Sequence, residues 1–252
     1  MLHAGLLRDA KPAAAQAAGG ACDWPARFRA LASSAHDPRL KAFYGAGVVD
    51  GGTPLQDVPL LALDVETTGL DPATDGMVSI GLVPMTLACI QASQGCHRLL
   101  KPRVPLADEA VTLHGITHQR LDQAPDLDEV LEQVLGCMAG RIMVVHCRDI
   151  ERQFLDQALR RRIGEGIEFP VIDTMELEAR LHRRPPPPWW LRLWQPQPVP
   201  VSIRLAASRA RYGLPRYRLH HAFSDALASA ELLQAQVAHH HGPQTPLRAL
   251  WH

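Results

Sequence analysis

The first half of the chain alternates short apolar runs with turn-forming residues. Residues 60–66 are almost continuously apolar, Asp71-Pro72 then marks a turn, and a second apolar run follows at 77–84. Two such runs joined by a turn predict a β-hairpin. We expect strands at 60–66, 77–84, 86–91 and 97–101, which together form an antiparallel set.

The second half alternates helical patterns with short apolar runs. Residues 126–129 place acids and a helix-capping signal ahead of an apolar stripe at helical spacing. We expect a short helix at 108–113, a helix from Asp126, a strand at 141–145, a helix at 149–162, a strand at 171–172, a helix at 174–181 and a final helix at 223–237. Strands followed by alternating helices and strands predict an α/β fold in which helices flank a mixed sheet.

The ends of the chain follow a different pattern. Residues 1–22 are rich in Ala and Gly and predict a poorly ordered tail, while 24–43 have loosely helical spacing and predict one or two helices. Glycines make 45–58 a linker. We therefore expect an N-terminal helical extension and linker at 1–57, a main domain at 58–238 and a C-terminal tail at 239–252.

One insert, at 183–200, breaks the rhythm of the main domain. Its four successive prolines favour an extended polyproline conformation and exclude a helix. Trp189, Trp190 and Trp194 follow within six positions. The sequence leaves three interpretations of these tryptophans open, namely packing on the domain, contact with a partner and stacking on bases.

Composition narrows the possible environments. The 252 residues have a formal net charge of zero, which argues against a binder that holds nucleic acid by bulk positive charge. The five cysteines form no Cys-x-x-Cys pair, so they suit a reducing cytoplasm and offer no zinc site. No apolar run approaches the roughly 20 residues needed to cross a membrane. We expect a cytoplasmic protein without a membrane partner.

Asp64 and Glu66 stand at the end of the first predicted strand. Alternate residues of a strand share a face, so both carboxylates point the same way. Two anions aimed together from a buried strand repel each other and lose hydration unless cations or donors lie between them. An isolated pair at this spacing is more often a solvated turn, but the Thr-Thr-Gly that follows supplies hydroxyls and a hinge. The pattern indicates a metal site.

Four segments resemble the motifs of one enzyme family. Residues 63–70 read Leu-Asp-Val-Glu-Thr-Thr-Gly-Leu, 113–117 read Leu-His-Gly-Ile-Thr, 144–155 begin Val-Val-His and end Phe-Leu, and 220–226 read His-His-Ala-Phe-Ser-Asp-Ala. In this order they resemble the first motif, a linking segment, the second motif and the third motif of the DEDDh 3′-5′ exonucleases, the group that contains the proofreading epsilon subunit of bacterial DNA polymerase III. The resemblance covers about residues 58–238 and implies a ribonuclease H-like fold.

The resemblance also implies a set of metal ligands. Asp64 would bridge two divalent cations, Mg²⁺ or Mn²⁺, while Glu66 and Asp225 would bind the ion that activates water. The second motif usually reads His-Asn-Ala-x-Phe-Asp, and the aligned residues here are His146, Cys147, Arg148, Asp149, Ile150 and Glu151. Glu151 therefore takes the place of Asp, with the same charge and one more methylene. Asp149 is the alternative ligand if the register differs by two residues.

The resemblance implies a catalytic histidine as well. His220 stands five residues before Asp225, the spacing of the DEDDh group, where it would take a proton from the attacking water. His221 stands four before Asp225, where the related DEDDy group has tyrosine. We prefer His220 because the rest of the motif aligns with the DEDDh form.

Substrate contacts are expected along the same segments. Thr67 and Thr68 would offer donors to the terminal nucleotide, Leu70 would wedge against its base, and His114 and Thr117 would border the cleft. Each of these residues suits a turn or the core equally well.

The predicted function is hydrolysis of phosphodiester bonds at the 3′ ends of single-stranded or frayed DNA, with release of nucleoside 5′-monophosphates in proofreading, repair or degradation. A polymerase or repair partner fits that role. Two alternatives remain. One is an RNA-trimming exoribonuclease, because no residue clearly reads a 2′-hydroxyl. The other is a polymerase-associated nucleic-acid-binding module with weak or no catalysis, which the Glu151 replacement motivates.

Overall fold

A five-stranded sheet forms the centre of the computed structural model, which describes residues 22–105, 114–183, 201–218 and 220–252. The strands lie in the order β3-β2-β1-β4-β5. Their bounds are Leu60–Thr67 for β1, Met77–Met85 for β2, Cys96–Leu99 for β3, Ile142–Val145 for β4 and Val171–Asp173 for β5. The first three strands pair antiparallel, and β4 and β5 run parallel to β1. The mixed sheet predicted from the sequence is confirmed.

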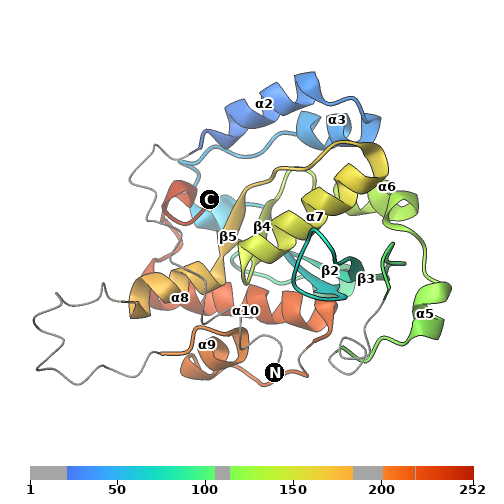
Figure 1. The fold of residues 1–252 in the computed structure, drawn as a ribbon. Coiled ribbons are helices and arrows are strands. Elements are labelled where there is room, and N and C mark those ends of the chain that lie inside the picture. Colours follow the sequence, from blue (N-terminus) through green and yellow to red (C-terminus); the bar gives the residue numbers. More distant parts are fainter. Residues whose placement is uncertain (1–21, 106–113, 184–200, 219) are drawn as a thin grey trace, which may run out of the picture.

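Helices cover both faces of this sheet (Figure 1). α10 (Ala222–His240) runs along one face, where it contacts β1, β2 and β4, with α8 (Thr174–His182) and α9 (Leu205–Arg211) beside it. α6 (Leu127–Met138) and α7 (Arg148–Ile163) lie toward the other face. β1 is thus enclosed on both sides, which explains its continuous apolar run. No helix in the described part of the chain is long and apolar enough to cross a membrane.

The N-terminal extension is helical, as predicted for 24–43. α2 (Trp24–Ser34) and α3 (Pro38–Gly45) each begin after an aspartate N-cap and have a proline within their first two residues. Phe28, Phe43 and Tyr44 pack against one another with ring centroids 5.1–5.4 Å apart, and they belong to the same hydrophobic core as the sheet. Burial of these aromatic rings fixes the extension to the domain.

The strand expected at 86–91 is wrong. Thr86 and Cys89 exchange backbone hydrogen bonds of 2.8 and 3.3 Å, so the chain forms a tight turn here, followed by a 3₁₀ helix, η2 (Ala92–Gln94). The apolar side chains of Leu87 and Ile90, which suggested a strand, pack on the core from this turn. An isolated bridge, rather than a ladder, joins Ile90 to Met85. The helix expected at 108–113, the tail at 1–21 and residues 184–200 of the insert lie outside the described residues.

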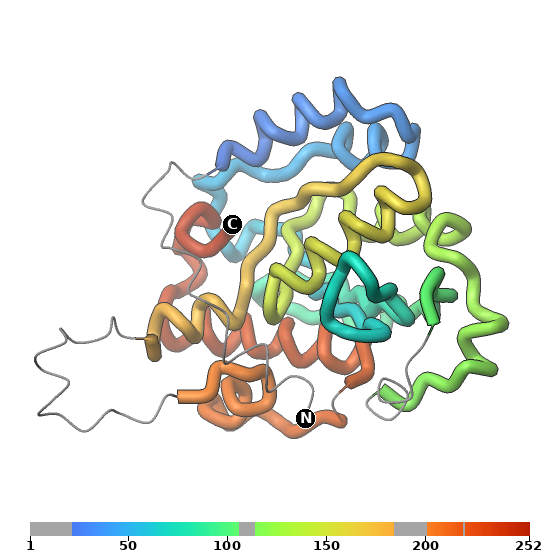
Figure 2. The backbone as a smooth tube through the Cα atoms, in the orientation of Figure 1, coloured from blue at the N-terminus to red at the C-terminus, as the bar shows by residue number. Residues whose placement is uncertain are grey.

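The C-terminal residues do not form a free tail, contrary to our expectation for 239–252. The chain beyond α10 passes through η3 (Leu247–Ala249), and Leu247, Leu250 and Trp251 are buried. Isolated bridges join Pro246 to Pro54 and Trp251 to Ile172 of β5. In Figure 2 the red C-terminal end lies beside the blue segment that follows α3. The apolar residues of this end complete the core, whereas His239, His240 and His241 are exposed, as expected.

One buried carboxylate joins α8, α9 and α10. Glu178 of α8 accepts hydrogen bonds from Arg211, from the Tyr212 hydroxyl at 2.8 Å and from the Gln236 amide at 2.8 Å. Burial would raise the pKa of Glu178, but these donors hold it below its ordinary value. The three helical elements therefore share one ionised acceptor.

Candidate active site

The two carboxylates of β1 lie on the face of the sheet that α10 covers. Asp64 pairs with Gly81 of β2, and Glu66 pairs with Ser79. Gly81 is required at this point, because a Cβ there would overlap the carbonyl group of Ala222. The first turn of α10 therefore sits directly on β2. This close approach carries Asp225, in the first turn of α10, toward Asp64 and Glu66.

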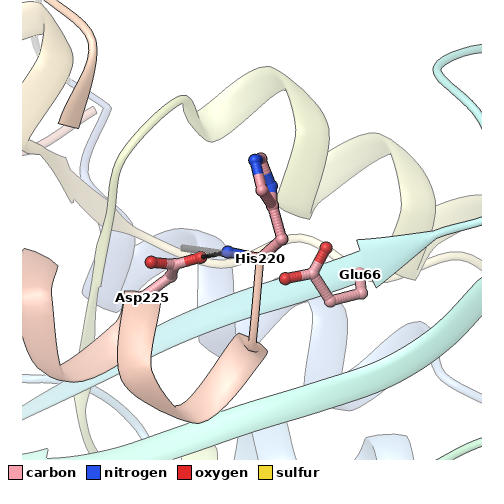
Figure 3. A group of neighbouring side chains, drawn as sticks. All are labelled: Glu66, His220 and Asp225. Carbon is pink, nitrogen blue, oxygen red and sulfur yellow. Dashed lines mark hydrogen bonds between the residues drawn. The ribbon is translucent and has the colours of Figure 1, made fainter. Parts of the chain in front are cut away.

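His220 and Asp225 form a closed turn at the start of α10. The backbone amide of His220 donates a hydrogen bond of 2.8 Å to Oδ2 of Asp225. His220 has a φ of 64°, in the left-handed region that residues other than glycine rarely adopt. Ligand atoms of Glu66, His220 and Asp225 lie within 4.8 Å of one another (Figure 3). The third sequence motif and the first are thus brought together.

The second motif supplies Glu151 rather than Asp149. β4 ends beside β1, and α7 starts there after Cys147, whose φ is 120°. Asp173 at the end of β5 holds this turn, since it accepts hydrogen bonds from the amides of Cys147 (3.2 Å) and Arg148 (3.1 Å). Glu151 is 2% exposed, whereas the side chain of Asp149 is 76% exposed. The two residues are only two positions apart in α7, about half a helical turn, so one carboxylate is buried and the other faces solvent.

The four carboxylates perturb one another. Burial raises the pKa of Asp64 well above its ordinary value, and the charges of Glu66, Asp225 and Glu151 raise it further. Burial and the charge of Asp225 raise the pKa of Glu66 to about 8. Burial likewise raises the pKa of Glu151 and of Asp225. Without a cation, this group favours protonated carboxyls.

The group fits divalent cations. Oδ1 of Asp225 and Oε2 of Glu151 are buried and have no hydrogen-bond partner among the described residues. An unpaired buried carboxylate oxygen is costly, and hard oxygen donors are what Mg²⁺ and Mn²⁺ bind. Asp64, Glu66, Glu151 and Asp225 therefore have the charge and the open oxygens that metal binding requires.

Further histidines lie around His220. Burial and then the charge of His220 lower the pKa of His114, whose Nδ1 accepts from the amide of Ile116 at 3.1 Å. The Nε2 of His114 is buried without a partner in the described structure. On the other side, the ring of His221 lies over the ring of His97, with centroids 4.4 Å apart. Sequence reasoning missed His97, because no motif contains it and only its pairing with Gly81 brings it here.

The predicted substrate-binding threonines have structural hydrogen bonds. The Thr68 hydroxyl donates to Asp75 (3.1 Å) and accepts from the amide of Gly76 (3.1 Å), and the Thr67 hydroxyl donates to the Gly69 carbonyl (2.5 Å). These bonds shape the β1–β2 turn. Leu70 is half-buried in the same turn, and Thr117 is the exposed N-cap residue of α5 (His118–Asp122).

His146, the first residue of the second motif, is a structural residue. Its half-buried ring is held between the Thr174 hydroxyl (2.8 Å) and the Ile203 carbonyl (3.1 Å). Burial lowers the pKa of His146 to about 4, so the ring is neutral at pH 7. It ties the end of β4 to the start of α8 and to the segment before α9.

A separate hollow of about 450 Å³ lies between Trp24, the turn at Asp71 and the outer side of α7. Asp156 and Glu168 also line it, and the guanidinium of Arg152 there is already bound to main-chain carbonyls. Acidic walls disfavour a phosphate. None of the residues that line the hollow belongs to the carboxylate group.

Comparison of the sequence with models of protein families identifies the family to which the chain belongs. The family model RNase_T, described as an exonuclease, matches residues 61–233, more than half of the chain. The chain belongs to this exonuclease family. The match includes all three motifs and the segment that links the first two, so the resemblance found in the sequence is confirmed.

This chain matches one part of much longer relatives. It is 30% identical over 176 residues to the DNA polymerase III PolC-type of Thermotoga maritima, an overlap that is 70% of this chain and 12% of that protein. It is 29% identical over 162 residues to the PolC-type polymerase of Bacillus subtilis, or 60% of this chain and 11% of that protein. The chain thus matches only about 11–12% of the length of these relatives.

Solved structures of other nucleases share the fold of this chain. The nuclease domain of 3′hExo, a DEDDh family member bound to rAMP, superposes with a TM-score of 0.59 at 16% identity, covering 74% of this chain and 94% of that one. Exonuclease X in complex with 5′ overhanging duplex DNA gives a TM-score of 0.55 at 22% identity, covering 75% and 98%. The ribonuclease H-like fold is confirmed. With the family match, the chain is an exonuclease whose motifs are those of the DEDDh group.

Proposed function

We propose that this exonuclease removes nucleotides from the 3′ ends of single-stranded or frayed DNA and releases nucleoside 5′-monophosphates. The observation that supports it best is the convergence of Asp64, Glu66, Glu151 and Asp225 beside His220. Two oxygens of this group are buried without a partner in the described structure. A site of this charge suits a phosphodiester only when cations neutralise it.

Two divalent cations, Mg²⁺ or Mn²⁺, are the proposed cofactors. Asp64 would contact both, Glu66 and Asp225 one of them, and Glu151 the other. When bound, the pair would activate the attacking water and stabilise the leaving 3′ oxygen. The extra methylene of Glu151 brings its carboxylate to the group from the first turn of α7, and the open Oε2 supports direct contact.

His220 is the proposed general base. Burial lowers the pKa of His220 below its ordinary value, so its imidazole is neutral at pH 7 and able to accept a proton. Its position within 4.8 Å of the ligand atoms of Glu66 and Asp225 places it beside the water that those residues would help to hold. His221 is turned toward His97 instead, which supports His220 over His221.

His114 is the best-supported substrate contact. Because its Nδ1 accepts a hydrogen bond, the neutral ring carries its proton on Nε2, a buried donor that has no partner in the described structure. A sugar hydroxyl or phosphate oxygen of the terminal nucleotide would satisfy it. The Thr68 amide already donates to the Gly76 carbonyl at 2.8 Å, so Thr67 and Thr68 would shape the turn beside the nucleotide. Leu70 and Thr117 would border the nucleotide.

DNA is the proposed substrate because the similar PolC-type polymerases are DNA polymerases by name. That relationship also supports a polymerase or repair partner and a cytoplasmic location. RNA is the second candidate, since the structurally similar nuclease domain of 3′hExo is bound to rAMP. The two sugars differ by a 2′-hydroxyl, and His114 would be able to bond either one.

Release of mononucleotides from matched 3′-labelled and 5′-labelled DNA and RNA single strands tests the proposal, with Mg²⁺, Mn²⁺ or EDTA present. We expect metal-dependent shortening from the 3′ end, faster on DNA. Faster shortening of RNA would make the protein an exoribonuclease. If 3′ ends are bound equally with metal or EDTA and no nucleotide is released, the protein is a binding module and the proposal fails.

A further inference from the structure

The rings of His97 and His221 form a contact that links the sheet to the start of α10. Their centroids are 4.4 Å apart, and the ring planes are inclined by 35°. His97 lies on β3 opposite Gly81, and His221 is the N-cap residue of α10. The contact therefore joins the edge strand to the residue that directly follows His220.

The backbone at His220 requires support from outside the turn. A non-glycine residue with a φ of 64° is in a strained conformation that persists only when its surroundings impose it. The bond from its amide to Asp225 fixes one side of the turn. His221 makes no side-chain hydrogen bond to the backbone of α10, and its Nδ1 lies 3.5 Å from the Ser224 hydroxyl. The face of its ring holds the other side of the turn by packing on His97.

Two glycines form the surface on which this turn packs. A Cβ on Gly81 would overlap the Ala222 carbonyl, and a Cβ on Gly95 would lie 2.5 Å from the ring of Phe223. Their absence lets the first turn of α10 sink onto β2 and the chain before β3. His97 is the large side chain beside these two gaps, and its ring packs on His221, the residue that precedes Ala222.

The chemistry of His97 favours contact through the ring face. Its Nε2 is buried and has no hydrogen-bond partner in the described structure. Burial and the neighbouring His221 lower the pKa of His97 to about 4, so the ring is neutral at pH 7. A neutral ring without a bond at Nε2 acts here as a flat packing surface.

We propose that His97 is a positioning residue that, by packing on His221, holds the backbone of His220 in the conformation that aims its imidazole at the carboxylate group. The role of His220 in this inference rests on the proposed function. The packing of the turn does not, and it is measurable in protein without metal.

Two substitutions at His97 separate packing from hydrogen bonding. His97→Ala removes the ring, whereas His97→Phe keeps a flat ring and removes the nitrogens. His239→Ala is the matched control, because His239 packs on the ring of Tyr212 at 5.3 Å near the other end of α10. Each variant is assayed for kcat and KM on a DNA single strand, and for hydrogen exchange of the His220 amide in EDTA.

We expect His97→Ala to lower kcat roughly tenfold to a hundredfold with little change in KM, because a displaced base loses alignment without weakening strand binding. The His220 amide should exchange at least ~10-fold faster, since its bond to Asp225 opens more often. His97→Phe should restore both values to near wild type, and His239→Ala should change neither.

Unchanged exchange and unchanged kcat in His97→Ala would overturn the inference. So would a His97→Phe variant as defective as His97→Ala, since the nitrogen rather than the ring face would then matter. If His97→Ala does not fold, His221→Ala removes the same contact from the helix side and is held to the same outcomes. A wild-type protein that releases no nucleotide defeats the proposed function, while the exchange measurement still decides the packing role.

Discussion

The backbone amide of His220 and the Oδ2 atom of Asp225 are joined by a hydrogen bond of 2.8 Å. One oxygen of Asp225 thus shapes the turn that carries the proposed base, and the other, Oδ1, is buried and open. The Oδ2 atom of Asp225 therefore has a structural role, and Oδ1 is open to bind a metal. A substitution that changes only one of these oxygens can separate the two roles.

Asp225→Asn is expected to abolish turnover without opening the turn. The amide oxygen of Asn still accepts from His220, but the charge that holds a cation is lost. Loss of several kcal/mol of metal assistance corresponds to at least ~100-fold lower kcat. Thermal unfolding in EDTA should occur at or above the wild-type temperature, because a buried anion is removed. Near-wild-type activity, with contaminating nuclease excluded, would reject the site; Asp64→Asn should behave similarly.

Glu151→Asp is expected to retain activity, and Glu151→Gln to lose most of it. The carboxylate of Glu151 raises the pKa of Asp64, which places it within the group. Asp149→Asn is the matched control, because its side chain is 76% exposed and should tolerate the change. Single-turnover assays of the three variants give the comparison. An active Glu151→Gln variant together with an inactive Asp149→Asn variant would shift the assignment to Asp149.

The metal-free protein is expected to lose stability as the pH rises. Glu66 has a pKa of about 8 in the folded state, against about 4.3 in an unfolded chain. The folded state therefore binds more protons between these values, and its free energy of unfolding falls through that window. Acids with a lowered pKa, such as Asp126 with a pKa of about 2, titrate below this pH window and do not oppose the fall.

Melting temperatures in EDTA from pH 5 to pH 8 test this expectation. We expect a fall of roughly 5 °C, equivalent to about 1–2 kcal/mol in a domain of this size. Glu66→Gln should flatten the curve. Mg²⁺ or Mn²⁺ should raise the melting temperature more at pH 8 than at pH 6, because ligands must be deprotonated to bind. A wild-type curve that rises across this window would contradict the raised pKa.

Arg218→Ala is expected to weaken binding of the nucleic acid strand. Nη2 of Arg218 lies 3.9 Å from the point where a Cβ on Gly115 would stand, next to His114. An exposed guanidinium there suits a phosphate of the strand. Loss of about 1 kcal/mol would raise KM roughly fivefold and reduce the salt slope by about one. Arg29→Ala on α2, across the molecule from α10, is the control. If both substitutions have equal effects on KM and on the salt slope, Arg218 does not contact the bound strand.

Much of the fold followed from local pattern. The strands at 60–66 and 77–84, the capped helix from Asp126 and the final helix all follow from periodicity and capping, which the sequence displays directly. The false strand at 86–91 shows the limit of this reasoning, because packing on the core makes a turn as apolar as a strand. The buried C-terminal residues were missed because the helical spacing of Leu247, Leu250 and Trp251 covers only one turn, too short a pattern to distinguish a packed end from a tail.

The site was predictable where it coincided with motifs. Asp64, Glu66, Glu151, His220 and Asp225 were named from the sequence, and the structure brings them together. His97 was not, because its place depends on the register of β3 against β2 and on the absence of a side chain at Gly81. Charge alone also does not place an arginine at the surface. Arg209, for example, is 3% exposed and binds main-chain carbonyls and Glu231.

The shared acceptor at Glu178 makes the Pro/Trp insert separable from catalysis. The described chain stops at Arg183 after α8 and resumes at Val201 before α9, and both helices are fixed to α10 through this carboxylate. Replacing residues 184–200 with a short flexible linker should therefore leave the active helix in place, because loop closure costs little when the ends are already held. Comparison of this deletion variant with the full chain would then test whether the tryptophans bind a partner, at an unchanged rate of nucleotide release.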